Sequence, residues 1–264
     1  MRSSLNVVSV AVVAVFGMLG LASCAGASPT AEVPTPSASA TSPGSGSPGA
    51  VVVTAPPACD DVELAPGAAV DGTALAACVV GFSRAAGSGH EYLQSGDTSG
   101  EVDFVYGDEP QMSGTLTGPD GPTSFVLTPD ESWVTINGAW VLGDVSSTDP
   151  SELVAGTVGM AYRAMADPSV AASMISASPT WTVQTDQDVV SLPSGDEVHA
   201  WRVQSDAPFA ALGTDVQEMI VWFAPGHIVV GNQATVTVGG VQTTTLQQYT
   251  DWGVPVTIEL PKTD

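Results

Sequence analysis

The sequence predicts an α+β fold of about ten strands, with helical segments before and between them. Short runs rich in Val, Thr and Trp recur along the chain, and turn residues separate them. One central segment, 151–176, instead has an Ala-, Met- and Val-rich composition typical of helices. Only 12% of the residues are charged and 44% are hydrophobic, so the chain can bury a core and is not a disordered acidic tail.

The first predicted helix begins at Asp71, whose side chain can cap the free N–H groups of a first helical turn. Leu75, Cys78 and Phe82 follow at spacings of three and four residues, which places them on one helical face. Gly87 then supplies the residue type that most often ends a helix. We therefore expect an amphipathic helix between Asp71 and Gly87.

A meander of strands is predicted after this helix. Its members are the runs 101–106, 112–116, 124–127, 133–136 and 140–142. The last two runs flank Asn137-Gly138, the dipeptide most typical of a two-residue hairpin turn, so this hairpin is the clearest in the chain.

The central helical segment contains two Asp-Pro pairs. Asp149-Pro150 precedes 151–165 and Asp167-Pro168 precedes 169–176, and each pair offers an N-cap followed by proline in the first turn. Three of the seven Met residues lie in this segment, and Met side chains adapt to irregular apolar shapes. Two interpretations stay open: a core under a sheet, or the wall of an apolar ligand cavity.

Strand patterns return after residue 180. The predicted runs are 181–185, 198–204, 219–223, 228–230, 234–238, 243–248 and 256–260. With the meander they complete one predicted domain over residues 59–264.

The charge balance argues against binding to nucleic acid. The chain has 28 Asp and Glu residues against 5 Lys and Arg, a formal net charge of −23. Binding to nucleic acid depends on clustered basic side chains that neutralise phosphates. The acidity equally argues against a folded domain that is itself drawn to anionic lipid headgroups.

The N-terminus resembles the export signal of bacterial lipoproteins. Arg2 precedes the apolar run 7–21, which ends in Leu21-Ala22-Ser23-Cys24, a match to the lipobox of that class. The resemblance implies a signal peptide over 1–23, a diacylglyceryl group on the Cys24 sulfur, and a protein anchored at the extracytoplasmic face of the cell membrane. The alternatives are a plain secretory signal with an incidental Cys, or an uncleaved anchor.

Residues 24–58 have the composition of a tether. Ala, Pro, Ser, Thr and Gly dominate this segment, and Glu32 is its only charged residue. Without large apolar side chains it cannot offset the entropy of ordering, so we expect a disordered linker that holds the domain away from the membrane.

With Cys24 lipidated, Cys59 and Cys78 remain to pair. Exported proteins keep disulfides, and a bridge here would close a loop of about 20 residues and stabilise the fold by ~3 kcal/mol. A metal site is the alternative, but no His stands near either Cys at ligand spacing.

No catalytic or cofactor motif is recognisable. His90, His199 and His227 are far apart, and no nucleophile elbow, zinc-protease motif, phosphate loop or dinucleotide fingerprint occurs. The acidic clusters 97–103, 108–109 and 186–188 lack the spacing of a Ca²⁺ loop, which favours solvated loops. We therefore expect a non-enzymatic protein without a metal or cofactor.

The tryptophans allow two interpretations. Trp133, Trp140 and Trp222 occupy strand positions, where packing in the core is the default and a platform for a sugar is the alternative.

Residues 59–264 resemble the actinobacterial envelope lipoproteins of the LppX/LprG type. The segments that carry the resemblance are the hairpin 133–140, the strand 197–203 (EVHAWRV) and the closing stretch 249–261 (YTDWGVPVTIELP). In that family a curved antiparallel half-barrel, described as LolA-like, has helices across its concave face. The strong acidity and the cysteine pair depart from the family pattern.

The resemblance implies a lipid-binding protein. In such proteins the space between sheet and helices holds the acyl chains of lipids or glycolipids, and the function predicted here is to bind such lipids or to transfer them. The residues that would line this cavity here are Phe104, Tyr106, Leu153, Val154, Val158, Tyr162, Met165, Met174 and Ile175. The alternative function is an envelope interaction or sensor domain whose core is filled and which works through protein contacts.

Overall fold

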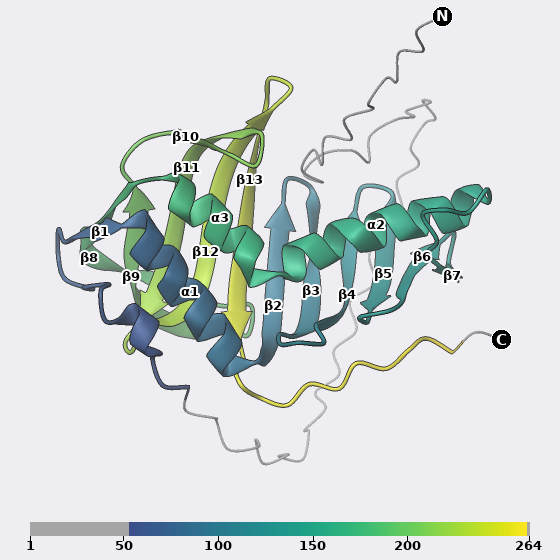
Figure 1. Ribbon diagram of the computed structural model, residues 1–264, viewed down its shortest axis with the longest axis horizontal. Helices are drawn as coiled ribbons and strands as arrows, with labels where there is room; N and C mark the ends of the chain where they lie inside the picture. The colour runs from purple at the N-terminus through teal and green to yellow at the C-terminus, as the bar shows by residue number, and fades with distance from the viewer. Residues whose placement is uncertain (1–52, 263–264) are drawn as a thin grey trace, which may run out of the picture.

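The computed structural model describes residues 53–262, with the side chains of Met165 and Ala166 excepted. The predicted signal peptide, the lipidation site Cys24 and all but the last six residues of the predicted tether lie outside this range. The described residues form three α-helices and a single large sheet, and the helices lie on one face of the sheet (Figure 1). The α+β class is therefore confirmed, while the sheet has thirteen strands and not about ten.

The N-terminal part leads into the first helix. A 3₁₀ turn, η1 (Pro57–Cys59), precedes the short strand β1 (Ala69–Asp71) and helix α1 (Gly72–Ala86). The Asp71 carboxylate accepts hydrogen bonds from the backbone N–H of Thr73 at 2.8 Å and of Ala74 at 3.0 Å. Gly87 ends the helix at φ 77°, a left-handed conformation that glycine adopts without strain. Both predicted ends of this helix are confirmed.

The meander follows and leads to the two central helices. Its strands are β2 (Ser88–Ser95), β3 (Thr98–Val105), β4 (Gln111–Gly118), β5 (Gly121–Leu127), β6 (Ser132–Ile136) and β7 (Ala139–Leu142). The helices are α2 (Pro150–Ala166) and α3 (Pro168–Ala177). Asp149 and Asp167 cap them as predicted, and Asn137 and Gly138 take the positive φ values that the predicted hairpin turn requires.

The remaining strands form the second half of the sheet. They are β8 (Thr180–Ser191), β9 (Glu197–Ser205), β10 (Phe209–Ala211), β11 (Thr214–Ala224), β12 (Ile228–Val238) and β13 (Val241–Thr250). The spatial order is β1-β8-β9-β11-β12-β13-β2-β3-β4-β5-β6-β7, and β10 pairs with β11. All recorded pairings are antiparallel, and the β13–β2 pair joins the two halves. Strands β1 and β7 end the order, so the sheet is open.

The strand predictions need corrections of three kinds. Strands β1, β2 and β10 were not predicted, the first and last because they have only three residues each. The runs 228–230 and 234–238 belong to the single strand β12. The run 256–260 is not a strand, since Asp251 and Gly253 adopt φ values of 55° and 75° that turn the chain out of the sheet.

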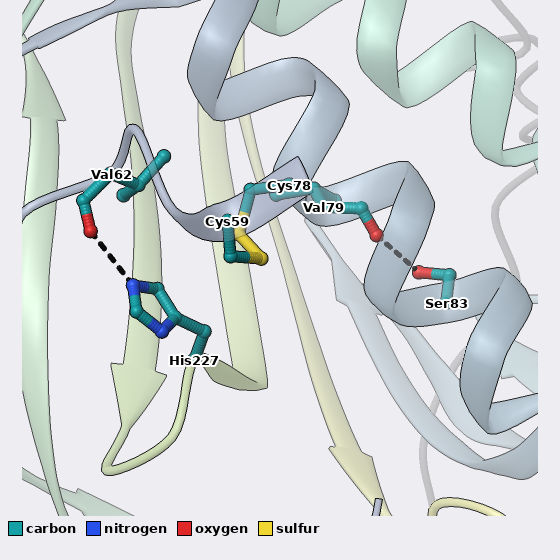
Figure 2. Close-up of a disulfide and its surroundings, with 6 residues drawn as sticks. All are labelled: Cys59, Val62, Cys78, Val79, Ser83 and His227. Atoms are coloured by element: carbon teal, nitrogen blue, oxygen red, sulfur yellow. Dashed lines mark hydrogen bonds between the residues drawn. A yellow bond between two sulfur atoms is a disulfide. The ribbon is translucent and has the colours of Figure 1, made fainter. Parts of the chain in front are cut away.

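The predicted disulfide between Cys59 and Cys78 is confirmed. It joins η1 to the middle of α1, and both cysteines are buried (Figure 2). His227 Nε2–H donates to the Val62 carbonyl at 2.8 Å, so the β11–β12 turn holds the segment that follows Cys59. Two long-range links therefore tie the N-terminal segment to the fold.

The core lies between the three helices and the sheet. Its largest fully buried side chains come from α1, α3 and six strands: Trp181, Phe82, Phe104, Phe125, Phe223, Leu75, Leu127, Ile175, Ile220, Val134, Val183 and Val203. A second, small apolar cluster, formed by Ala200, Ala224 and Val230, lies apart from this core.

Helix α2 approaches the sheet closely because glycines line its contact face. A Cβ added to Gly159 would lie 2.5 Å from Ser132 Oγ, and one added to Gly156 would lie 2.8 Å from the backbone nitrogen of Val145. A Cβ added to Gly143, which follows β7, would lie 2.6 Å from the backbone nitrogen of Gly156. The first part of α2 therefore leaves no space between itself and the strands beneath it.

This close approach gives a first testable prediction. We expect Gly159→Val to destabilise the protein by about 1–3 kcal/mol, because the added side chain must push α2 away from β6. Urea unfolding of the variant measures this loss. Ala164→Val is the control, since Ala164 lies exposed on the same helix. Equal midpoints for the two variants would contradict the described contact.

Candidate functional site

A small, partly open cavity lies where α1, α3 and the middle of the sheet meet. Its volume is about 60 Å³. The apolar residues around it are Val79 of α1, Pro168, Ala171 and Ile175 of α3, Met219 and Val221 of β11, and Val229 of β12. The first turn and the middle of α3 form its roof, and Figure 1 shows this helix lying across β12 and β13.

Polar side chains of the sheet form part of the cavity's wall. Asn232 on β12 and Gln247 on β13 are cross-strand neighbours, and both line the cavity. Asn232 Nδ2 donates to the Tyr249 hydroxyl at 3.0 Å. Gln247 Nε2 donates to the Glu91 carboxylate at 2.6 Å. An otherwise apolar cavity therefore has hydrogen-bonding groups on one side.

Glu91 is the buried carboxylate of this group. It sits on β2, pairs with Tyr249 across the sheet, and is 4% exposed. Burial raises the pKa of Glu91 from 4.5 to about 7, against the lowering effects of the Gln247 hydrogen bond and of His90. Burial also raises the pKa of Tyr106 and Tyr249, and the charge of Glu91 adds to both shifts. Both phenols therefore stay protonated at neutral pH.

Aromatic rings fill the space next to the cavity. Phe104 stacks on Tyr106 with ring centroids 4.5 Å apart, and Trp252 contacts Phe104 and Phe82 edge-on, each at 5.2 Å. Trp252 Nε1–H donates to the Val229 carbonyl at 2.7 Å. These contacts fix the rings, so the neighbouring part of the helix-covered face is packed.

Helix α3 is held firmly at its C-terminal end. Trp181 Nε1–H donates to the carbonyls of Ile175 at 3.3 Å and Ser178 at 3.2 Å. Gly72 packs so tightly against the Ser178 carbonyl that an added Cβ would overlap it. At the other end, Pro168 has no N–H and breaks the hydrogen-bond ladder between α2 and α3. Helix α3, which covers the cavity, is thus held at its C-terminal end, and at its N-terminal end it follows a break in the helical hydrogen-bond pattern.

The residues predicted to line a ligand cavity are divided among several environments. Two of the nine, Tyr106 and Ile175, line the cavity. Leu153 and Val154 lie on the exposed face of α2, at 42% and 51% exposure, and face solvent. The other residues with described side chains pack in or against the core: Phe104, Val158, Met174, and Tyr162, whose ring centroid is 4.3 Å from that of Phe125. The Met165 side chain lies outside the described part.

Sequence reasoning missed the polar group formed by Glu91, Asn232, Gln247 and Tyr249. A single Glu in a polar run such as Ser88–Ser95 gives the pattern of an exposed loop. Only the pairing of β13 with β2 brings Glu91 beside Gln247 and Tyr249. The alternation of Glu91 with the buried Leu93 is the one local signal that could have indicated an inward-facing carboxylate.

The three histidines do not come together as a catalytic group. His90 Nδ1–H donates to Asp103 on the face of the sheet away from the helices, His227 contacts the Val62 carbonyl, and His199 is exposed on β9. Within residues 53–262, no set of three or more His, Cys, Asp or Glu side chains gathers as a metal site would require. In the same range, no helix has the length and apolar character needed to cross a membrane.

No family model matches the chain, and no curated protein matches it.

Proposed function

We propose that this chain is a non-enzymatic, extracytoplasmic lipoprotein with a LolA-like fold that binds an acyl lipid beneath helix α3. The observation that carries the proposal is the cavity between α1, α3 and the sheet, with an apolar ring and a polar wall. The order of elements also supports it, since all three helices lie across one face of one antiparallel sheet (Figure 1). The lipobox at Cys24 and the resemblance to LppX/LprG-type proteins point to the same class.

Binding in this account requires α3 to move. Ligand sites for whole small molecules typically have about 300–1,000 Å³, whereas this cavity has about 60 Å³. Because Pro168 interrupts the helical hydrogen bonds between α2 and α3, the first turn of α3 can lift from β12 and β13. The C-terminal end of α3 stays in place. Each buried methylene gains ~0.8 kcal/mol, so an acyl chain of about sixteen carbons supplies on the order of 12 kcal/mol to offset this opening.

A variant that fills the cavity tests the proposal. Ala171 lines the cavity from α3, so Ala171→Phe is expected to abolish uptake of a pyrene-labelled fatty acid by the full-length chain carrying Cys24→Ser. Ala177→Phe is the control, because Ala177 is exposed at the end of the same helix. Circular dichroism checks that both variants fold. Unchanged uptake by Ala171→Phe would show that the ligand does not enter under α3.

A second candidate function is an interaction domain with a filled core. The observation that favours it is the exposed apolar face of α2, where Leu153, Val154 and Met160 are 42–52% exposed. Exposed apolar groups that gather in one place often mark contacts with other proteins. The packed rings of Phe82, Phe104 and Trp252 are also what a filled core requires. Absence of lipid uptake by the parent chain, in the same experiment, would favour this function.

A further inference from the structure

The face of the sheet opposite the helices carries a continuous row of side chains across six strands. Tyr92, Glu101, Thr115 and Ser124 are successive cross-strand partners on β2, β3, β4 and β5. The Ser124 backbone N–H donates to Thr135 Oγ1 at 2.8 Å, and Thr135 pairs with Trp140 on β7. Residues that alternate with this row, such as Leu93 and Val102, are buried in the core. The row therefore faces away from α1, α2 and α3.

An open groove of about 640 Å³ follows this row. It is shallow and open to solvent, so a ligand lying in it would keep one side in water. Hydroxyl side chains supply much of its lining: Ser99, Ser113, Thr115, Thr117 and Ser124. Thr115 Oγ1 and Ser124 Oγ lie 2.8 Å apart and share a hydrogen bond, which links these two hydroxyls across β4 and β5.

The charge of the groove excludes anionic ligands. Glu101 and Asp103 contribute carboxylates, and none of the described lining residues is Lys or Arg. Both carboxylates are exposed, and His90 Nδ1–H donates to that of Asp103 at 2.9 Å. Carboxylates and hydroxyls accept hydrogen bonds from ligand O–H groups, whereas phosphate, sulfate or uronate groups would be repelled.

Aromatic rings stand at both ends of the row. Tyr92 is on β2 and Trp140 on β7, five strand steps away, which corresponds to about 24 Å at ~4.8 Å per step. Both residues line the groove and are only partly buried. Trp140 thus belongs to the open face of the sheet. The default expectation for its strand position was packing in the core, and for Trp140 that expectation is wrong. An aromatic ring offers an apolar face to the C–H side of a sugar while its surroundings stay polar.

We propose that this groove binds an uncharged oligosaccharide, extended across strands β2–β7. The aromatic rings stack on sugar units at the two ends, and Glu101 with the Ser and Thr hydroxyls accepts hydrogen bonds from sugar O–H groups. This site is separate from the cavity under α3, because the two lie on opposite faces of the sheet. A chain so built would contact a neutral glycan on one face while it holds its lipid under the other.

Titration calorimetry with three uncharged hexasaccharides (maltohexaose, cellohexaose and α-1,6-mannohexaose) tests this site on the full-length Cys24→Ser chain. We expect at least one to bind, and Trp140→Ala and Glu101→Gln each to weaken that binding by about tenfold or more. Trp222→Phe and Asp97→Asn are matched controls outside the groove lining and should bind as the parent chain does.

A third variant covers the case in which Trp140→Ala does not fold. Thr115 is exposed at the middle of the row, so Thr115→Arg should block the groove without disturbing the core. Binding of none of the three hexasaccharides, or binding that Thr115→Arg and Glu101→Gln both leave unchanged, would overturn the proposal. Salt-sensitive binding of hexalysine in place of the sugars would equally overturn it and identify the groove as a cation site.

Discussion

Replacing Glu91 by Gln is expected to stabilise the protein at pH 8. It should also remove a pH dependence of the free energy of unfolding between about pH 4.5 and 7. The pKa of Glu91 is raised to about 7 in the folded protein, so the folded state holds this proton more tightly than the unfolded chain does. The contribution of protonated Glu91 to the free energy of unfolding is complete below pH 4.5 and is lost as the pH rises through 7. At ~1.4 kcal/mol per pH unit, the loss is about 3 kcal/mol.

Urea unfolding of the parent chain and of Glu91→Gln from pH 4 to 8 measures this effect. The two stability curves should converge at low pH and separate by about 3 kcal/mol at pH 8. Glu101→Gln is the control, because Glu101 is exposed on the neighbouring strand β3, and its curve should run parallel to that of the parent chain. Parallel curves for Glu91→Gln as well would mean that Glu91 is not buried as described.

Removing the Cys59–Cys78 bridge should have an effect of similar size. The bridge closes a loop between η1 and α1 with a sequence separation of 19, and in the chain-entropy model its loss costs ~3 kcal/mol. The double variant Cys59→Ala/Cys78→Ala is therefore expected to unfold at a clearly lower urea concentration than the parent chain.

A reducing agent provides the matched control for the bridge. Dithiothreitol should lower the unfolding midpoint of the parent chain towards that of the double variant and should leave the double variant unchanged. A parent chain that keeps its midpoint when fully reduced would show that the bridge contributes little to stability. In that case the His227–Val62 hydrogen bond and the burial of η1 would hold this segment without it.

The local signals in the sequence predicted the helices and the disulfide well. Asp71, Asp149 and Asp167 cap their helices because each carboxylate reaches free N–H groups two or three residues later, a contact that depends on neighbouring residues alone. The Asn137-Gly138 turn is equally local. Cys59 and Cys78 could be paired by elimination, since Cys24 was assigned to the lipid.

What depended on long-range pairing could not be predicted in this way. Strand β2 was missed because its polar sequence becomes strand only between β13 and β3. Leu153 and Val154 fit an apolar cavity by composition, but Gly156 and Gly159 take the sheet-facing positions of α2 and turn both side chains outward. The polar group around Glu91 needs three strands in register, a property that no single run of residues carries.

The most direct test of the central claim is native mass spectrometry of the full-length chain carrying Cys24→Ser, expressed in a lipid-bearing host and followed by organic extraction. Replacing Cys24 eliminates the covalent lipid, and the comparison with Ala171→Phe separates lipid held under α3 from lipid held by the apolar run 7–21. The account predicts near-stoichiometric acyl lipid in the parent chain and in Ala177→Phe, and its loss in Ala171→Phe. A lipid-free mass for the parent chain, with no uptake of added phospholipid or glycolipid, would contradict the account.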